Sequence, residues 1–294
     1  MLLVTLMKGL STTKTANEIT SEVTSETTSE TTSEATSEAT SETTSEATTE
    51  MPQKTVLVCD VGRLDYQQAW HKQLELHRRV AEGTAPPTLL LVEHPPVITF
   101  GRKGGRENLL TDEATLRQNG FSLYDIERGG DVTYHGPGQL VGYPIFRVGR
   151  RVRDFLRNLE QVIVQVLASY SIPSAGSSGY AGVWVDDLDP LAGASKDAKI
   201  TAIGVAVKRH VAFHGFAMNV STNLEHFAHI VPCGIADKRV TSLSQLLGRD
   251  VPLAEVQPKI ITAFNDVFDI DMTAVSEKEL FGENTNNLHA VMEG

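Results

Sequence analysis

A glycine-rich stretch in the middle of the chain limits what the chain can fold into more than any other feature. Residues 128–139 read RGGDVTYHGPGQ and contain four glycines and one proline. Glycine permits positive φ and a close approach of a ligand to the backbone, and proline fixes the turn between two of the glycines. A hairpin without a ligand is the alternative. The interleaved Arg128, Tyr134, His135 and Gln139 instead favour a rigid pair of loops that presents a binding site beside an apolar slot.

The remaining patterns predict a mixture of strands and helices. Short apolar runs bounded by turn residues predict strands at 54–61, 88–93, 97–100, 121–127, 140–145, 182–185, 199–207 and 211–220. Apolar residues recurring every three or four positions predict helices at 65–81, 111–118, 152–170, 242–247 and 253–268. The polar residues 187–198 are interpreted as a surface insertion. This irregular alternation predicts an α/β or α+β fold.

The first fifty residues differ in composition from the rest of the chain. From Thr20 to Glu50 the sequence repeats Thr-Ser-Glu-x, without large apolar side chains except Val23. Such a segment cannot bury a core, so we predict a disordered tail over residues 1–53. Met51 resembles a natural start, which leaves Met1 and Met51 as alternative start codons. We predict one catalytic domain over 54–275 and a C-terminal tail over 276–294.

Charge and cysteine content exclude several classes of protein. Residues 1–50 hold two lysines and nine glutamates, so they account for −7 of the net charge of −11. The remaining charge gives no sign of nucleic-acid binding. No apolar run is long enough to span a membrane. The two cysteines, Cys59 and Cys233, form neither a disulfide framework nor a zinc pattern. These features favour a cytoplasmic protein, and Cys233, between proline and glycine, is the candidate for a reactive thiol.

Three further motifs follow the glycine-rich stretch in a fixed order. They are KITAIG at 199–204, FHGFAMNV at 213–220 and PCG at 232–234. Together with RGGDVTYHGPGQ they resemble the lipoyl(octanoyl) transferases, and Glu93-His94-Pro95-Pro96-Val97 with Gly101-Arg102 is similar to that family's N-terminal signature. The resemblance covers roughly residues 54 to 270. Four ordered motifs are far more specific than any single one.

The resemblance implies a fold, a reaction and a set of site residues. The fold is that of biotin and lipoate protein ligases, a mixed sheet flanked by helices. The family's catalytic pair matches Cys233 and Lys199, and its chemistry implies no metal, ATP or other cofactor. The substrate-binding residues that it implies are Arg128, Gly129, Gly130, Asp131, Val132, Thr133, Tyr134, His135, Ala202, Ile203, Gly204, Gly215, Phe216 and Ala217.

The expected reaction is a two-step acyl transfer. A thiol needs a nearby cation or base to attack a carbonyl, and a lysine ammonium favours the thiolate. The resemblance implies that Cys233 takes an octanoyl group from octanoyl-acyl carrier protein. A lysine of a lipoyl domain, in 2-oxoacid dehydrogenases or the glycine cleavage H protein, then accepts it. On the residues alone, Lys199 also fits a solvated strand-start lysine and Cys233 an inert loop thiol.

Three other functions stay open at this point. An ATP-dependent lipoate or biotin ligase would use the same fold but would not need the Pro-Cys-Gly site. A non-catalytic module would bind acyl groups or lipoyl domains. A cysteine hydrolase would pair Cys233 with His135 or His214. The residues that flank His210 and His214 are predicted to form strand, where four residues span about 13 Å, so we assign no metal.

One surface feature suggests a partner. Arginines at 147, 150, 151 and 153 form a basic cluster after the central strand. It fits either a solvated face or a dock for an acidic acyl carrier protein through charge steering. We expect the protein to act as a monomer.

Overall fold

The computed structural model describes residues 55–176, 181–189, 194–231 and 239–282. The predicted tail at 1–53 and the candidate nucleophile Cys233 lie outside the described residues. So do most of the residues after 275, from 283 onward.

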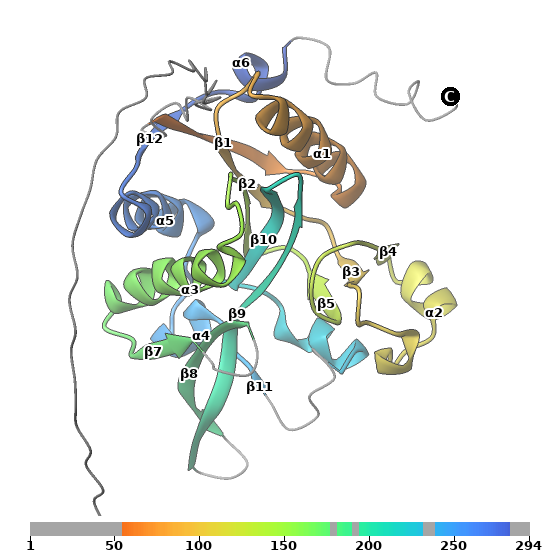
Figure 1. The fold of residues 1–294 in the computed structure, drawn as a ribbon. Helices are drawn as coiled ribbons and strands as arrows, with labels where there is room; N and C mark the ends of the chain where they lie inside the picture. Colours follow the sequence, from red (N-terminus) through yellow and green to blue (C-terminus); the bar gives the residue numbers. More distant parts are fainter. Residues whose placement is uncertain (1–54, 177–180, 190–193, 232–238, 283–294) are drawn as a thin grey trace, which may run out of the picture. The chain divides into compact units, whose positions relative to one another are not determined.

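A mixed sheet of nine strands forms the centre of the described part of the chain (Figure 1). Its strands lie in the order β12 (Asp271–Ala274), β1 (Thr55–Arg63), β2 (Thr88–Glu93), β6 (Gln139–Ile145), β10 (Val211–Asn219), β9 (Ala194–Lys208), β8 (Gly182–Asp189) and β7 (Ser174–Gly176). β12, β1 and β2 are parallel, and the strands from β2 to β7 are antiparallel. The short β11 (Arg239–Val240) pairs with β9 in parallel.

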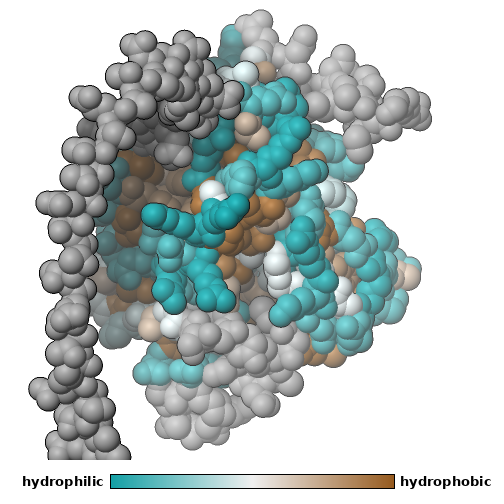
Figure 2. All heavy atoms as spheres, in the orientation of Figure 1, coloured by the Kyte–Doolittle hydropathy of each residue, from teal (hydrophilic) through white to brown (hydrophobic). Residues whose placement is uncertain are grey.

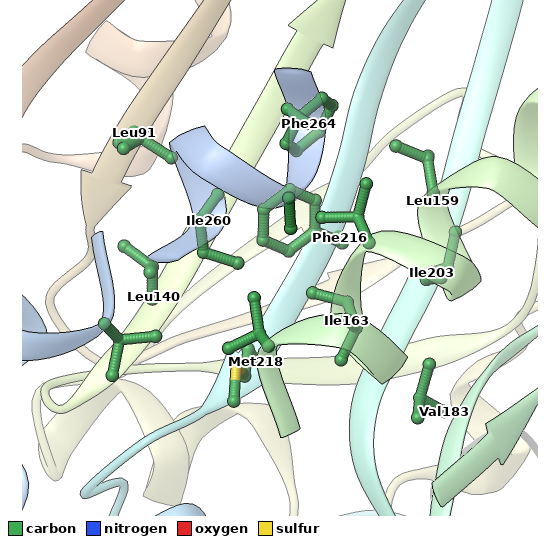
Figure 3. Packing of buried hydrophobic residues seen from close by; sticks show 14 of the residues in the cluster. Leu91, Leu140, Leu159, Ile163, Val183, Ile203, Phe216, Met218, Ile260 and Phe264 are labelled. Atoms are coloured by element: carbon green, nitrogen blue, oxygen red, sulfur yellow. The ribbon is translucent and has the colours of Figure 1, made fainter. Parts of the chain in front are cut away.

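Two long helices cover one face of this sheet. The helix α3 (Val152–Ala168) buries Phe155, Leu159 and Ile163 among other residues spaced by three and four. It packs with α5 (Leu253–Phe268), and the short α4 (Leu243–Leu247) precedes α5. Figure 3 shows side chains of these helices meeting Phe216 and Met218 of β10. This face therefore forms the main hydrophobic core.

The opposite face is covered by α1 (Tyr66–Glu82). The side chain of Asp65 caps its first turn by accepting from Gln67 N at 2.8 Å, and Gly83 ends it in the left-handed region at φ 76°. Leu76 and Val80 pack there against Tyr143 and Phe213 of the sheet. The smaller α6 (Glu277–Phe281) adds Leu280 to the same cluster.

A second, three-stranded sheet lies on the side of the molecule away from α3 and α5 (Figure 1). Its order is β4 (Ser122–Asp125), β3 (Val97–Phe100) and β5 (Val132–His135). It carries α2 (Glu113–Gln118) and two 3-10 turns, η1 (Arg106–Asn108) and η2 (Leu224–His229). In Figure 2 hydrophilic residues cover most of the face shown, and hydrophobic residues lie in the recess between them.

The predicted fold class is confirmed, and so are most elements. The prediction of two joined loops over 128–139 is wrong in its middle, because Val132–His135 is a strand paired with β3. Within the segment 187–198, predicted as an insertion, the described residues 187–189 and 194–198 extend β8 and β9, with Asp187 paired to Lys196 and Asp189 to Ala194. β12 and α6 were not predicted, because their sequences show little apolar periodicity. They pack at an edge and an end of the fold. Helical structure therefore continues past residue 275.

Candidate active site

A cavity lies where β6, β9 and β10 pass the loop that leads into β5. It is a partly open hollow, and its empty volume of about 520 Å³ includes space that belongs to the open solvent. It is lined by every predicted substrate-binding residue except one: Arg128, Gly129, Gly130, Asp131, Val132, Thr133, His135, Ala202, Ile203, Gly204, Gly215, Phe216 and Ala217. Lining residues as far apart in the sequence as Arg128 and Ala217 are thus brought to one site by the pairing of β10 with β6 and β9.

The glycine loop is held directly against β9. Gly129 N donates to Val205 O at 2.9 Å. A Cβ on Gly204 would stand 2.8 Å from Gly129 O, so only glycine permits this approach. The buried guanidinium of Arg128 donates to Thr99 O at 2.8 Å and to Thr99 Oγ1 at 3.1 Å. The loop is therefore fixed to both sheets.

The predicted residue that does not line the cavity is Tyr134. Side chains alternate along β5, so Thr133 and His135 face the cavity while Tyr134 faces the core of the small sheet. Its hydroxyl lies 2.7 Å from Nδ1 of His226, and its ring packs against Phe227. Strand geometry therefore turns the Tyr134 side chain away from the cavity that the other predicted residues line.

A buried hydrogen-bond chain runs along the floor of the site. Gln139 Oε1 can only accept, so Nδ1 of His135 carries the proton that joins them at 2.8 Å. Gln139 Nε2 donates to Asn219 Oδ1 at 2.8 Å, and Asn219 Nδ2 donates to Thr241 O at 3.0 Å. Burial lowers the pKa of His135 to about 3. The hydrogen-bonding groups of the floor are therefore paired with one another, and the floor is uncharged.

A second histidine beneath the cavity is satisfied in the same way. His94 Nδ1 donates to Leu64 O at 2.8 Å, so Nε2 accepts from the Tyr143 hydroxyl at 2.8 Å. Burial lowers the pKa of His94 to about 4. Because its polar atoms are paired within the protein, Tyr143 presents mainly its ring to the cavity.

A bulge in β9 determines the face of the sheet on which Lys199 lies, although Lys199 is not among the residues that line the cavity. Val183 pairs with Thr201 and Trp184 with Lys199, so β9 has one extra residue, Ile200, at this point. The bulge reverses the alternation of side chains: Ile200 joins the α3–α5 core, and Lys199 lies on the face of Ala202 and Gly204. Lys199 is 6% exposed, and its Nζ lies 4.6 Å from the centre of the Trp184 ring.

The described residues on either side of Cys233 border this site. Val231, two residues before it, donates to Asn108 O at 2.8 Å, and Asn108 Nδ2 donates to Asp131 Oδ2 at 2.7 Å. After the gap, Val240 pairs with Lys199, and Thr241 N donates to Lys199 O at 3.0 Å. The described residues that flank Cys233 in the sequence thus bond to Asn108 on one side and to Lys199 on the other.

His214 lines the cavity although the sequence did not assign it to substrate binding. It is 2% exposed and has φ 56°, a conformation that is uncommon outside glycine. Its Nε2 lies 3.6 Å from Oε2 of Glu127, which is longer than a hydrogen bond. Neither ring nitrogen has a hydrogen-bond partner among the described residues. Burial lowers the pKa of His214, which favours the neutral imidazole.

Four other lining residues were also missed: Tyr66, Val141, Tyr143 and Ala181. Val141 and Tyr143 alternate along a strand that follows the glycine-rich stretch, and this pattern was a usable signal. Tyr66 comes from the first turn of α1 and Ala181 from the start of the β8 hairpin. Nothing local in the sequence brings those two together.

The basic cluster after the central strand lies far from Lys199. Val148 N donates to His210 O at 2.9 Å, which places the cluster beside the β9–β10 turn. Nine residues of β9 separate Lys208 from Lys199, or about 30 Å of strand. A carrier protein docked there would have to deliver its thioester over that length, so the position of the cluster weighs against the docking interpretation.

None of the described helices is long and apolar enough to cross a membrane. The described part of the chain also holds no group of three His, Cys, Asp or Glu side chains placed to bind a metal ion.

Comparisons with known proteins were made against this geometry. A family model described as lipoyl protein ligase A/B catalytic domain matches residues 65–265. The chain is 46% identical over 224 residues to an octanoyltransferase of Alkaliphilus metalliredigens, covering 75% of this chain and 98% of the relative. It is 53% identical over 190 residues to an octanoyltransferase of Deinococcus radiodurans, covering 64% and 56%.

Among solved structures, similar folds occur in lipoate protein ligases. Lipoate-protein ligase A bound with ATP has a TM-score of 0.61 and 18% identity, covering 77% of this chain and 90% of the other. A bipartite lipoate protein ligase from Thermoplasma acidophilum has a TM-score of 0.59 and 18% identity, covering 77% and 88%. At this identity the likeness concerns the fold alone.

Proposed function

The chain belongs to the family of lipoyl protein ligase A/B catalytic domains, as an acyltransferase of the octanoyltransferase group, and we propose how it transfers octanoyl groups in lipoylation. The donor is octanoyl-acyl carrier protein. The acceptor is a lysine of a lipoyl domain. Cys233 is the nucleophile, and the acyl group passes through a thioester on its sulfur. The observation that carries the proposal is the β9 bulge that places Lys199 on the face of the sheet that carries the lining residues Ala202 and Gly204.

The first step exchanges one thioester for another. The Cys233 thiolate attacks the carbonyl carbon of the donor, and the C–S bond to the carrier breaks. The carrier thiolate leaves and takes up a proton. Exchange between thioesters is nearly isoenergetic, so this step needs no ATP. The flanks of residues 232–238, tied to Asp131 at one end and Lys199 at the other, support a reaction at this end of the cavity.

The second step forms the amide. The acceptor lysine arrives as an ammonium and must lose a proton before it can attack. Lys199 in its neutral form takes that proton, the C–N bond forms as the C–S bond to Cys233 breaks, and the second proton lost by the amine passes to the leaving sulfur of Cys233. The cavity holds the octanoyl chain during both steps. Burying its methylenes contributes up to about 5 kcal/mol at roughly 0.8 kcal/mol each.

The covalent step can be tested by mass. The protein is incubated with octanoyl-acyl carrier protein and no ATP, and intact and peptide masses are measured. We expect an octanoyl adduct on the Cys233 peptide that disappears when a lipoyl domain is added. The matched control is Cys59→Ala, because Cys59 is fully buried and burial raises its pKa to about 11. Cys59→Ala should keep the adduct, and Cys233→Ala should lose both adduct and transfer.

Two outcomes would contradict this mechanism. Transfer without any adduct in single-turnover samples would indicate direct attack on the donor, and transfer only with ATP would indicate a ligase. The role of Lys199 is tested separately with Lys199→Met, which keeps the length of the side chain. We expect transfer to fall by roughly 10²- to 10⁴-fold, the usual contribution of general acid–base catalysis.

A further inference from the structure

The cavity has two distinct ends along β9 and β10. Its lining residues on these strands are 202–204 and 214–217. Ala181 lines one end, and Lys199 lies next to this end without lining the cavity, since a Cβ on the neighbouring Gly182 would lie 3.5 Å from Lys199 Cε. His214, which pairs with Val205, is the lining residue of β10 farthest from Lys199. An acyl chain attached at the Lys199 end therefore extends toward His214.

The far end is closed by backbone and by the imidazole. The glycine loop crosses β9 there, where Gly129 N donates to Val205 O at 2.9 Å. The His214 ring stands beside it, held between the Phe213 ring, whose centre is 4.9 Å away, and Glu127. The backbone of His214 is fixed as well, because its N–H donates to Gln73 Oε1 at 2.9 Å. The ring is thus a buried wall that contacts the cavity with unpaired nitrogens.

We propose that His214 sets the length of acyl chain that the protein accepts. This inference rests on the proposed function, because it takes the Lys199 end as the reacting end. Lys199 Cε lies beside Gly182, which pairs with Ala202, so the reacting end is at the level of Ala202. Three residues of strand, from Ala202 to Val205, span about 10 Å. An extended octanoyl chain has seven carbon–carbon bonds, each advancing about 1.25 Å, or about 9 Å in all. The distance from the reacting end to the imidazole therefore fits eight carbons.

A longer chain would have to displace the ring. The ring cannot move away from the cavity without pressing on Glu127 or Phe213. Interiors packed at this density do not absorb extra methylenes without strain. The floor of the cavity does not yield either, since His94 and His135 are held by hydrogen bonds. Chain-length selection is thus assigned to one side chain.

The left-handed backbone conformation of His214 permits substitutions that remove the ring and leave the strand unchanged. Glycine adopts φ 56° without strain and asparagine tolerates it, so His214→Gly and His214→Asn remove the ring in two steps without disturbing the strand. The matched control is His210→Gly. His210 also has positive φ, at 64°, but it is exposed at the β9–β10 turn and does not line the cavity.

The experiment measures kcat/KM with octanoyl, decanoyl and dodecanoyl thioesters of acyl carrier protein and a lipoyl domain as acceptor. We expect His214→Gly to raise the decanoyl-to-octanoyl ratio about tenfold or more, with His214→Asn between it and the wild type. Transfer of octanoyl itself should fall, since the chain loses contacts. His210→Gly should keep the wild-type ratio.

The outcomes separate this inference from the proposed function. If His214→Gly still transfers octanoyl groups and its chain-length ratio is unchanged, the inference is overturned and the function stands. If the wild-type protein transfers none of the three chains, the proposed function itself fails. Thermal unfolding of each variant confirms that a changed ratio is measured on folded protein.

Discussion

Lys199 lies in a setting that a surface lysine would not have. Its ammonium is buried over the face of Trp184, and the two residues are direct partners on β9 and β8. A cation over an aromatic ring is stabilised by about 0.5–1 kcal/mol at exposed sites and by about 2 when desolvated. The ring therefore holds the ammonium in one place, and Trp184 is a positioning residue for Lys199.

Replacing this ring should lower turnover more than substrate binding. We expect Trp184→Leu to reduce kcat by roughly 3- to 30-fold with little change in KM, and Trp184→Phe to recover part of the loss. The control is Tyr170→Leu, which removes a similar pair, Lys259 over Tyr170 at 4.9 Å, outside the cavity. The measurement is kcat and KM from steady-state kinetics, with both the acyl donor and the lipoyl-domain acceptor varied. An equal loss in Tyr170→Leu would mean that only stability changed.

At the scale of an element, the β8–β9 pair determines which face Lys199 occupies. The extra residue in β9 brings the Thr201 carbonyl close to Gly182 of β8, whose φ is 137°. A Cβ on Gly182 would lie 2.5 Å from Thr201 O, so a side chain there must push the strands apart. Trp184 lies two residues after Gly182 on β8, and Lys199 lies three residues before Ala202, which pairs with Gly182. The register at the reacting end therefore depends on this glycine.

Gly182→Ala should therefore affect both stability and transfer. We expect a loss of more than about 1 kcal/mol in the free energy of unfolding, measured in urea, together with reduced turnover. Gly120→Ala is the matched control: φ is 82° there, but no atom lies within 4 Å of the added Cβ. Gly120→Ala introduces the same kind of backbone strain as Gly182→Ala but no clash with a neighbouring atom. If the two variants lose the same stability, the close approach at Gly182 contributes nothing.

At the scale of the whole molecule, the buried histidines link stability to pH. Burial lowers the pKa of His94 to about 4 and that of His135 to about 3, below the value of about 6.5 in an unfolded chain. Between pH 6.5 and about 4 the unfolded chain binds protons that the native protein does not bind. Stability should thus be complete above pH 6.5 and fall as the pH drops through this window.

Urea unfolding at several pH values between 7.5 and 5 measures this effect. Each such histidine contributes a slope of up to about 1.4 kcal/mol per pH unit. We expect His94→Gln, which removes one titrating group, to be less stable than the wild type at pH 7.5 but to lose less on acidification. A wild-type slope retained in full by His94→Gln would show that His94 is not protonated on unfolding.

Local patterns in the sequence were enough to predict most of the fold and most of the residues that line the cavity. Phe155, Leu159 and Ile163 recur at helical spacing, and the order of the four motifs indicated the family. Thirteen of the fourteen predicted substrate-binding residues line one cavity. The exception, Tyr134, depended on whether its segment was a loop or a strand, and pairing with the distant β3 decides that. Alternation within the strand then turns its side chain away.

By itself, then, the sequence determined the class of fold, the family and the candidate catalytic lysine, because these depend on local periodicity and on residue order. The tertiary structure decided which face Lys199 occupies, through a bulge that is visible only when β9 is paired with β8. It also decided that His214 closes the cavity, since that requires β10, the glycine loop and Glu127 to meet. Contacts between residues far apart in the chain arise from packing, and no local pattern encodes them.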